Sequence, residues 1–489
     1  MKESIKTDIS VDLDENLKYI KDLLKDNSDI IFREFYIGKY KAFLMYIDGM
    51  GDKVLLNDFI LETLMIEKDQ VEEIRDIKDI KEKILTVTDI REEKNLSKAI
   101  NSVLSGDTIL SIETLASCFV ISSRLWPARG ITEPSAETAI RGGRDGFTET
   151  LRFNTALVRR RIKDTRFKMV SKVFGERSKT DTVVMYIDDI VNEDVLKELD
   201  KRLAKIDIDA VLDSGYIEQL IEDNQWSIFP QIQSTERPDV VAAAVYEGRV
   251  AIIVDNSPFA LIIPATLANL LQSPDDYYQR WMYSSLVRVI RIISIFLSLT
   301  LPALYVAITS FHPAIIPTKL AFFIAASREG VPFPAYIEAL IMEVLFAFLI
   351  ESVIRLPKPI GMTIGIVGGL IVGQAAVSAG IVSQIMIIIV SLTAITTFMT
   401  SNYGLTIAIR MIRFVLIIAA SIMGLYGIMI ALIVVTIHLI KLKSFGVSYL
   451  APLTNPNIND FKDMFVRIPL KYFRRRPAYM KTQDKIRQK

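Results

Sequence analysis

The chain has 489 residues, a formal net charge of +1 and 24% charged side chains, which are ordinary values for a soluble protein and leave room for two or three domains. The single cysteine, Cys118, excludes a disulfide within the chain and a zinc–cysteine cluster. The two histidines, His312 and His438, have no neighbours typical of a metal site. We therefore expect no metal, no cofactor and no nucleic-acid partner.

The average composition hides two unlike regions. Roughly the first 285 residues have the pattern of a charged, soluble α/β protein, and the residues that follow are mostly apolar. Between Lys358 and Arg410, a run of 51 residues contains no Asp, Glu, Lys or Arg. One membrane span needs only about 20 residues to cross about 30 Å of hydrocarbon. The sequence therefore predicts a soluble α/β region followed by an all-α, multi-pass transmembrane bundle.

Two short patterns recur in the soluble region. Residues 43–48 (FLMYID) are followed by the similar residues 183–188 (VVMYID), and in each copy an apolar strand ends in an acidic turn and leads into a helix. Residues 105–110 (SGDTIL) correspond to residues 247–252 (EGRVAI), where a shared glycine turn opens a strand. Because the two offsets are 140 and 142 residues, we predict two related α/β subdomains.

The first residues, Met1-Lys2-Glu3-Ser4, lack the apolar segment of a signal peptide, so the soluble region is expected to stay cytosolic. Composition and motifs then set the boundaries of six predicted parts. These are an N-terminal extension (1–28), subdomain 1 (29–130), an Arg/Gly-rich linker and helix (131–168), subdomain 2 (169–285), the transmembrane bundle (286–442) and a basic cytosolic tail (443–489).

An unusual segment, residues 133–162, lies between the two subdomains. Gly142, Gly143 and Gly146 interrupt regular structure, and Thr148 is the predicted start of a helix that ends in an arginine cluster. An Arg/Gly loop can bind phosphate, but this one lacks the Lys-Ser/Thr ending of a P-loop. We expect instead that it faces anionic lipid head groups or the carboxylates of a neighbouring subunit. The residues assigned to this contact are Glu133, Pro134, Arg141, Arg144, Glu149, Arg152, Asn154, Arg159, Arg160 and Arg161.

This segment, with its Glu-Pro pair, its RDGFTE sequence and its Arg-Arg-Arg-Ile ending, closely resembles the hallmark of the A subunits of GerA-type spore germinant receptors. The resemblance extends over nearly the whole chain and includes Pro332, Pro334, Glu338 and residues 356–361 (LPKPIG). It implies a receptor subunit in the inner membrane of a bacterial endospore, which responds to small nutrients by releasing ions. The implied partners are a transporter-like B subunit and a lipoprotein C subunit.

Five segments of the apolar region are predicted spans: residues 292–309, 335–354, 361–380, 383–402 and 414–440. Arg280, Arg288 and Arg291 precede the first span and basic residues follow the last, so both flanks are predicted to be cytosolic. Five crossings would put the flanks on opposite sides. One segment is therefore expected to be re-entrant or interfacial, and residues 313–330 are a further segment that could dip into the membrane.

The second predicted span carries Glu338, Glu343 and Glu351, although a carboxylate in hydrocarbon costs several kcal/mol. At about 100° per residue, Glu343 and Glu351 lie about 80° apart on one side of a helix. A ring of such acids from several copies would attract cations, so all three are assigned to a candidate ion pathway. The alternative is that Glu338 and Glu351 lie at the ends of the span or pair with Arg328 and Arg355.

Small residues mark the two spans that follow. A glycine every fourth residue allows helices to pack closely or to slide; these are Gly361, Gly365, Gly369 and Gly373. Threonine hydroxyls on one face of the next helix either line a wet path or bond to backbone and neighbouring helices. The threonines assigned to the ion pathway are Thr393, Thr397 and Thr400.

No nucleophile–base pair, metal-ligand spacing or nucleotide motif supports an enzyme, and Asp48 and Asp188 are expected to be ordinary turn residues. Two functions remain. In the first, copies of the chain form a ligand-gated cation channel with a cytosolic ring of soluble domains. In the second, the chain is a non-conducting receptor or scaffold that docks a transporter-like, nutrient-binding partner. A secondary transporter is not favoured because the membrane segments show no repeat.

Overall fold

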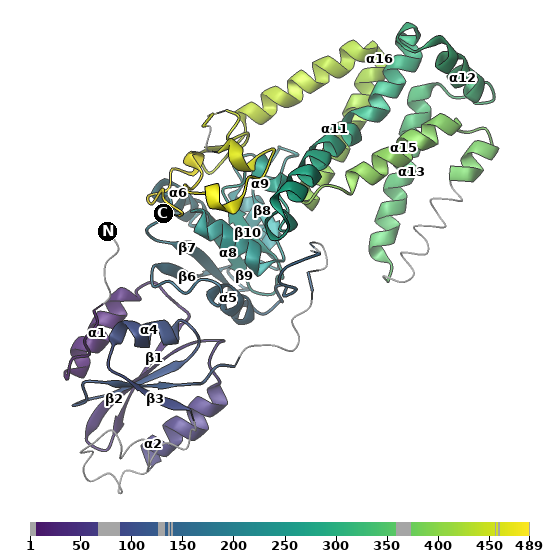
Figure 1. Cartoon of the computed structure of the whole chain (residues 1–489). Helices are drawn as coiled ribbons and strands as arrows, with labels where there is room; N and C mark the ends of the chain where they lie inside the picture. The colour runs from purple at the N-terminus through teal and green to yellow at the C-terminus, as the bar shows by residue number, and fades with distance from the viewer. Residues whose placement is uncertain are drawn as a thin grey trace. The chain divides into compact units, whose positions relative to one another are not determined.

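The computed structural model of the chain describes residues 6–66, 89–125, 133, 134, 137, 140–357, 373–454, 456, 457 and 460–488 (Figure 1). These residues form two compact units. The α/β unit contains the chain up to residue 223, residues 232–264 and residues from 473 onward; the helical unit contains residues 224–231 and 265–472. The chain therefore passes between the units four times, at 223/224, 231/232, 264/265 and 472/473.

The α/β unit contains, in its described part, two antiparallel five-stranded sheets with the same strand order (Figure 1). The first sheet has the order β1-β2-β4-β5-β3 and the second β6-β7-β9-β10-β8. The strands of the first are β1 (Ile30–Ile37), β2 (Tyr40–Ile47), β3 (Ile90–Glu93), β4 (Thr108–Ile112) and β5 (Cys118–Ile121). Those of the second are β6 (Phe167–Phe174), β7 (Thr180–Ile187), β8 (Gln233–Thr235), β9 (Val250–Val254) and β10 (Ala260–Ile263).

The two repeated sequences occupy equivalent places in these sheets. The first lies at the end of β2 in one sheet and at the end of β7 in the other. The registers also match: Met45 of β2 pairs with Ile109 of β4, and the equivalent Met185 of β7 pairs with Ala251 of β9. The second opens β4 and β9 at Gly106 and Gly248, whose φ angles of 99° and 88° favour glycine. The prediction of an α/β region is confirmed, and the internal repeat extends from the sequence to the topology.

Helices follow the same order in both halves of the α/β unit. The first half has α1 (Leu13–Leu23), η1 (Leu55–Leu61), α2 (Glu62–Ile66) and α4 (Leu96–Val103), and the second α5 (Leu151–Arg159), α6 (Glu193–Leu203), α7 (Ser214–Ile221) and α8 (Pro238–Tyr246). The Asn16 carboxamide in α1 accepts from the Ser10 N–H at 2.9 Å and donates to its carbonyl at 2.6 Å. Asn154 in α5 does the same to Thr148, at 2.8 and 2.5 Å. This third repeat is too short to be noticed without the structure.

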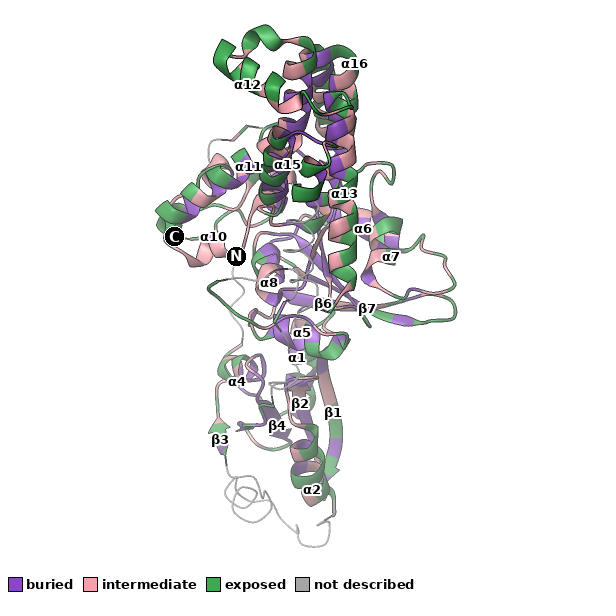
Figure 2. Cartoon of the chain, turned by 90° about the vertical axis from the view of Figure 1, so that its right-hand side faces the viewer, coloured by how far each residue is buried: buried purple, intermediate pink, exposed green. Residues whose placement is uncertain are grey.

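The first sheet is covered on both faces, which explains why consecutive residues of β2 are apolar. Phe43 and Met45 pack in the cluster that contains α1 and α4, whereas Ala42 and Leu44 pack with η1 and α2. Figure 2 shows the buried colour on strands of both sheets, whereas β1 and β3 also carry the exposed colour. Burial of each large apolar side chain contributes about 1.5–3 kcal/mol to the free energy of folding. The strands that carry the repeated sequences therefore form a large part of the hydrophobic core.

The last residues of the chain are part of the α/β unit. The backbone N–H groups of Gln483 and Asp484 donate to the carbonyls of Ile190 and Asp189 at 3.2 and 3.1 Å. These carbonyls follow β7, in the turn that ends the second copy of the first repeated sequence. The predicted basic tail is therefore divided between the two units, and its last part is folded rather than free.

Among its described residues, the helical unit contains two helices that are long and apolar enough to cross a membrane, α11 and α16. The helices that the structure describes here include α9 (Leu267–Leu271), α10 (Asp275–Tyr278), α11 (Trp281–Phe311), η2 (Pro313–Ile315), α12 (Thr318–Arg328), α13 (Ala335–Arg355), α15 (Gln384–Thr397) and α16 (Tyr403–Lys441). The helical character of the predicted apolar region is confirmed for its described residues. The five predicted spans do not appear as five such helices in the described part, because α13 carries several charges and α15 has only 14 residues.

α16 consists of two helical arms joined at Gly424, where φ is 60° and ψ is −138°. This kink lies at the end of α11, since a Cβ on Gly424 would come within 2.9 Å of the Phe311 Cβ. At the other end, the segment 224–231 contacts both Gly404, at the start of α16, and His438, near its end. Both ends of α16 therefore lie at one end of the helical unit, and the kink lies at the other (Figure 1).

The kink predicts that Gly424→Ala destabilises the helical unit. Alanine at this φ and ψ costs about 1–3 kcal/mol in backbone strain, and its Cβ would also clash with Phe311. The measurement is thermal unfolding of the full chain in nanodiscs. Gly330→Ala is the control, because nothing lies within 4 Å of a Cβ at Gly330. Equal melting temperatures for the two variants would contradict a kink that requires glycine.

Candidate functional site

The arginine-rich motif forms the helix α5. The helix begins at Leu151 rather than at the predicted Thr148, and its first N–H donates to the Asp255 carboxylate at 3.0 Å. Asn154 is fully buried and holds the preceding turn, whereas Glu149 lies before the helix and is exposed. The motif therefore shapes a helix start instead of an open loop.

Arg159, at the end of α5, is fully buried and paired within the chain. Its Nε and Nη2 donate to the two carboxylate oxygens of Asp29 at 2.8 Å each, and Nη2 also donates to Asn27 at 2.7 Å. The guanidinium lies 4.7 Å from the centre of the Phe167 ring. Because Asp29 precedes β1 and Arg159 ends α5, this bidentate pair joins the two halves of the α/β unit. The expectation that Arg159 faces lipid or a neighbouring subunit is wrong.

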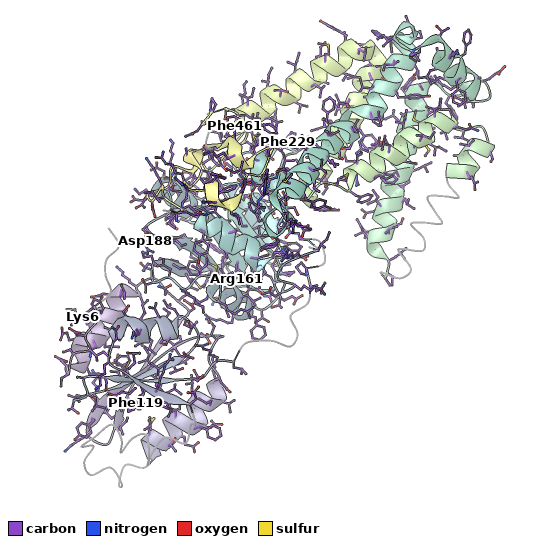
Figure 3. All side chains as sticks on the ribbon, in the orientation of Figure 1. Lys6, Phe119, Arg161, Asp188, Phe229 and Phe461 are labelled. Atoms are coloured by element: carbon purple, nitrogen blue, oxygen red, sulfur yellow. The ribbon has the colours of Figure 1, made fainter. Side chains whose placement is uncertain are left out.

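The next arginines of the motif are also paired. Arg161, labelled in Figure 3, donates to both carboxylate oxygens of Asp145 at 2.7 and 2.6 Å, and Arg160 lies 3.8 Å from the same carboxylate. Arg152 lies 3.5 Å from Asp48, the turn residue that ends the first copy of the repeated sequence. Most of the arginine cluster is thus held by acids of this chain.

The beginning of the motif is more exposed. Glu133 and Arg144 pair at 3.2 Å with both side chains exposed, Arg141 is exposed, and Pro134 is buried. An exposed pair of this kind contributes about 0–1 kcal/mol to stability. For Glu133, Arg141 and Arg144, contact with lipid or with another subunit stays a prediction.

Glu137 connects the motif segment to β8. The Thr235 hydroxyl donates a short hydrogen bond to its carboxylate, and Arg237 donates to its carbonyl at 3.2 Å. Burial raises the pKa of the Glu137 carboxyl to about 7, against the opposing effects of Thr235 and Arg237. Burial, together with the nearby Glu222, raises the pKa of Glu218 in α7 to about 7 as well. The α/β unit therefore holds two carboxyl groups that titrate near neutral pH.

In the helical unit, Glu343 of α13 is neutralised by Arg413 of α16. The Arg413 Nη1 donates to both carboxylate oxygens at 3.0 Å, and Nη2 donates to the Thr397 hydroxyl at 2.7 Å. Glu343 is 2% and Arg413 1% exposed. Either group left unpaired in this position would be strongly unfavourable, so the pair fastens α13, α15 and α16 together. Glu343 presents no free carboxylate to a passing cation.

The other two glutamates of α13 pair with arginines, which is the alternative given in the sequence analysis. Glu338 is fully buried and accepts from Arg328 at 3.1 Å and from the Ser383 N–H at 2.9 Å. Glu351 pairs with Arg355 one turn further along α13, at 2.5 Å, and both side chains are largely exposed. Of the three acids assigned to the ion pathway, Glu351 is the one that is open to its surroundings.

The threonine stripe is bonded to backbone, as the alternative interpretation expects. The hydroxyls of Thr393 and Thr397 donate to the carbonyls one turn earlier, at 2.7 Å each, and Thr400 donates to the Thr397 carbonyl at 3.0 Å. Thr397 accepts from Arg413 as well, so it belongs to the buried triad. The stripe provides no row of free hydroxyls.

The glycine ridge is described at one position. A Cβ on Gly373 would lie 3.8 Å from the Ile387 side chain, which is an ordinary contact. Gly361, Gly365 and Gly369 lie outside the described residues. A role for the ridge in close packing or gating stays a prediction.

Sequence reasoning missed the partners of these buried charges. Arg413 lies just outside the predicted last span, so it was not paired with Glu343. Arg288, expected only to mark a cytosolic flank, is fully buried between Asp276 and Asp463 at 3.1 and 2.8 Å. The available signal was the rule that a charge within an apolar helix needs an opposite charge on a neighbour.

The described residues do not support a metal-ion site or a reactive cysteine. No group of three or more His, Cys, Asp or Glu there could hold a metal ion. His438 bonds to Ser227 at 2.9 Å and stacks on Phe229. Burial raises the pKa of the Cys118 thiol to about 12, so this thiol is protonated and unreactive at neutral pH.

A soluble α/β domain of two like sheets, joined to apolar helices that carry paired charges, defines a membrane-associated protein. The family described as "Bacillus/Clostridium GerA spore germination protein" matches residues 18–479. The chain belongs to this family of germinant receptor A subunits and is involved in spore germination, which confirms the resemblance of the motif.

Two curated relatives and one solved structure are similar to this chain. "Spore germination protein GerLA" of Bacillus cereus is 41% identical over 472 residues, which are 96% of each chain. "Uncharacterized membrane protein YfkQ" of Bacillus subtilis (strain 168) is 44% identical and covers 96% of this chain and 91% of its own. The crystal structure of the N-terminal domain of the A subunit of the Bacillus megaterium spore germinant receptor GerK3 is 37% identical, with a TM-score of 0.43, over 54% of this chain and 99% of that one.

The buried pair predicts that Arg159→Ala destabilises the α/β unit by about 3–5 kcal/mol, because Asp29 would be left buried and unpaired. The measurement is urea unfolding of the full chain. Arg144→Ala, which removes an exposed pair, is the control and should shift stability by less than about 1 kcal/mol. An Arg159 variant as stable as this control would show that the pair does not hold the two halves together.

The raised pKa of Glu137 predicts a loss of stability as pH rises. The unfolded carboxyl has the ordinary pKa of 4.5, so the folded state binds more protons between about pH 4.5 and pH 7. Stability from this group is therefore present below pH 4.5 and is lost as pH rises through 7. Melting temperatures from pH 5 to pH 8 should show the decline, and Glu137→Gln should reduce it. Glu218→Gln tests the second carboxyl independently, and a decline unchanged in both variants would contradict the assignment.

Proposed function

We propose that this A subunit acts in a nutrient-responsive receptor of the spore inner membrane, and that copies of it assemble around a cation conduit. The partners implied by the resemblance are a transporter-like B subunit, which would bind the nutrient, and a lipoprotein C subunit. The α/β unit would face the cytosol, and ion release through the conduit would start germination.

The fold of the segments before and after the helical unit supports the cytosolic placement of both flanks. Residues 473–488 fold into the same unit as residues 232–264, which favours one side of a bilayer for both flanks and an even number of crossings. The arms of α16 have 21 and 17 residues, which correspond to about 31 and about 26 Å at 1.5 Å per residue. If each arm crosses, the five predicted spans become six passes, and no segment has to be re-entrant.

The observation that carries the channel proposal is a charged pair on an unpacked face of α13. The face is exposed at Val344 and Phe348, and Glu351 and Arg355 are exposed further along it, because residues spaced i, i+4, i+7 and i+11 share one side of a helix. Charged side chains that face lipid are costly. This face of α13 therefore suits a water-filled space or the surface of another copy, and we assign Glu351, rather than Glu343, to the conduit.

The buried glutamates favour a second function. Glu338 and Glu343 are neutralised inside a single copy of the chain, which leaves them no part in conduction. The chain would then be a non-conducting receptor or scaffold, in which the triad of Glu343, Arg413 and Thr397 keeps the helices rigid. Such a scaffold would transmit nutrient binding from a partner to the next step of germination.

Cation flux distinguishes the two functions. The full chain is reconstituted with its B and C partners in liposomes, and potassium release is followed with and without nutrient. In a channel, Glu351→Gln should change cation selectivity or flux, whereas Glu329→Gln, which neutralises an exposed acid outside α13, should not. Glu343→Gln should instead lower the yield of folded protein, because Arg413 loses its partner.

Each outcome has a definite meaning. Nutrient-dependent potassium release that depends on Glu351 supports the channel. If the receptor supports germination in spores but its liposomes release no potassium with or without nutrient, the scaffold is supported and the conduit is overturned. A folded Glu343→Gln variant with altered cation selectivity would show that Glu343, rather than Glu351, lines the conduit.

A further inference from the structure

A short segment of the chain, residues 224–231, leaves the α/β unit after α7, joins the helical unit, and returns to β8. We call this segment the finger. Its ends are clasped together, because the Gln231 carboxamide accepts from the Asn224 N–H at 2.9 Å and donates to the Asn224 carbonyl at 2.8 Å. Within it, the Asn224 side chain accepts from the Trp226 N–H at 3.0 Å. The finger therefore has a fixed conformation.

The finger is fastened to one end of the helical unit. The Phe229 side chain, labelled in Figure 3, is 6% exposed and lies 6.1 Å from the His438 ring and 6.2 Å from the Tyr449 ring. The Ser227 hydroxyl bonds to His438 at 2.9 Å, and the Ser444 hydroxyl donates to the Gln231 carbonyl at 2.7 Å. These contacts hold the finger beside the last turn of α16.

The tip of the finger presents a tryptophan to the outside. Trp226 is 95% exposed, although Phe229, three residues later, is buried. A large amphipathic ring held out on a rigid turn is unfavourable in water alone, and tryptophan prefers the layer where hydrocarbon meets water. The fixed backbone means that little ordering is needed when such a ring enters that layer.

The position of the finger marks this layer. The last turns of α16 expose Ile433, Val434, Ile437 and Ile440, and the helix ends at Lys441, so an apolar surface gives way to a basic one beside the finger. Other exposed aromatic rings lie at the same end of the unit, at the starts of α11 and α16; these are Trp281, Tyr283 and Tyr403. Aromatic rings and basic residues together are typical of a membrane–water interface.

We propose that the finger is an interfacial anchor whose Trp226 indole inserts among the lipid head groups of the leaflet at which α16 begins and ends. The inference rests on the proposed function in one respect, that α11 and α16 cross a bilayer. The partner is the lipid interface rather than a protein, because the exposed surface continues into the apolar side chains of a membrane helix and ends in lysine. A neighbouring copy or a partner subunit on Trp226 is the competing outcome of the test.

The test uses full chains with one tryptophan each in nanodiscs of phosphatidylcholine brominated at shallow or deep acyl positions. Trp126→Phe with Trp281→Phe leaves Trp226, and Trp126→Phe with Trp226→Phe leaves Trp281 as the marker of the helix start. A third chain without natural tryptophans carries Tyr36→Trp, at an exposed position in β1 of the α/β unit. We expect blue-shifted Trp226 emission that shallow bromines quench more strongly than deep ones, and no quenching of the residue at position 36.

Two results would overturn the anchor. Red-shifted Trp226 emission without quenching places the ring in water, and blue-shifted emission without quenching means that protein covers it. If Trp281 is still quenched in either case, α11 is at the membrane. The anchor proposal would then be wrong, while the proposed membrane function would stand. Absence of quenching for both Trp226 and Trp281 would sink the anchor and the proposed membrane function together.

Discussion

A buried charge without a partner is strongly unfavourable, and buried pairs of opposite charge join elements in both units of the chain. In the α/β unit, Arg159 and Asp29 join the two sheets. In the helical unit, Glu343 and Arg413 join three helices. Removing one partner of such a pair is strongly destabilising, because the other charge stays buried without its partner. Replacing both partners with apolar residues of the same volume is often neutral for stability. The pairs therefore specify which elements meet, and this selection is their contribution beyond stability.

The sequence predicted elements well and their partners poorly. The repeated Met-Tyr-Ile-Asp strand ends and glycine turns were visible because they are local, and the sheets place them in equivalent strands. The partner of Arg159 lies 130 residues away and that of Glu343 lies 70 residues away, and no local pattern reports such a distance. The sequence therefore predicts the arginine cluster at a surface, whereas its first member, Arg159, is in the core.

The helical region shows a related limit. Hydropathy found the residues of α11 and α16, but it could not see that Gly424 folds α16 back on itself, because glycine is common in apolar helices. Five spans and two cytosolic flanks contradict each other. If both arms of α16 cross, as proposed above, this contradiction disappears. Counting rules for membrane segments fail where a single apolar run contains a reversal.

The four passages of the chain between units have a consequence for biogenesis. The turn after β7 is covered by residues 483 and 484, which leave the ribosome after every apolar helix has been made. If the helices cross a bilayer as proposed, the α/β unit can begin to fold early but is completed only when residues 473–488 return to its side of that bilayer. A nascent chain inserted with an odd number of crossings would strand that end and leave an unfinished surface, by which quality-control proteases could distinguish it from a correctly inserted copy.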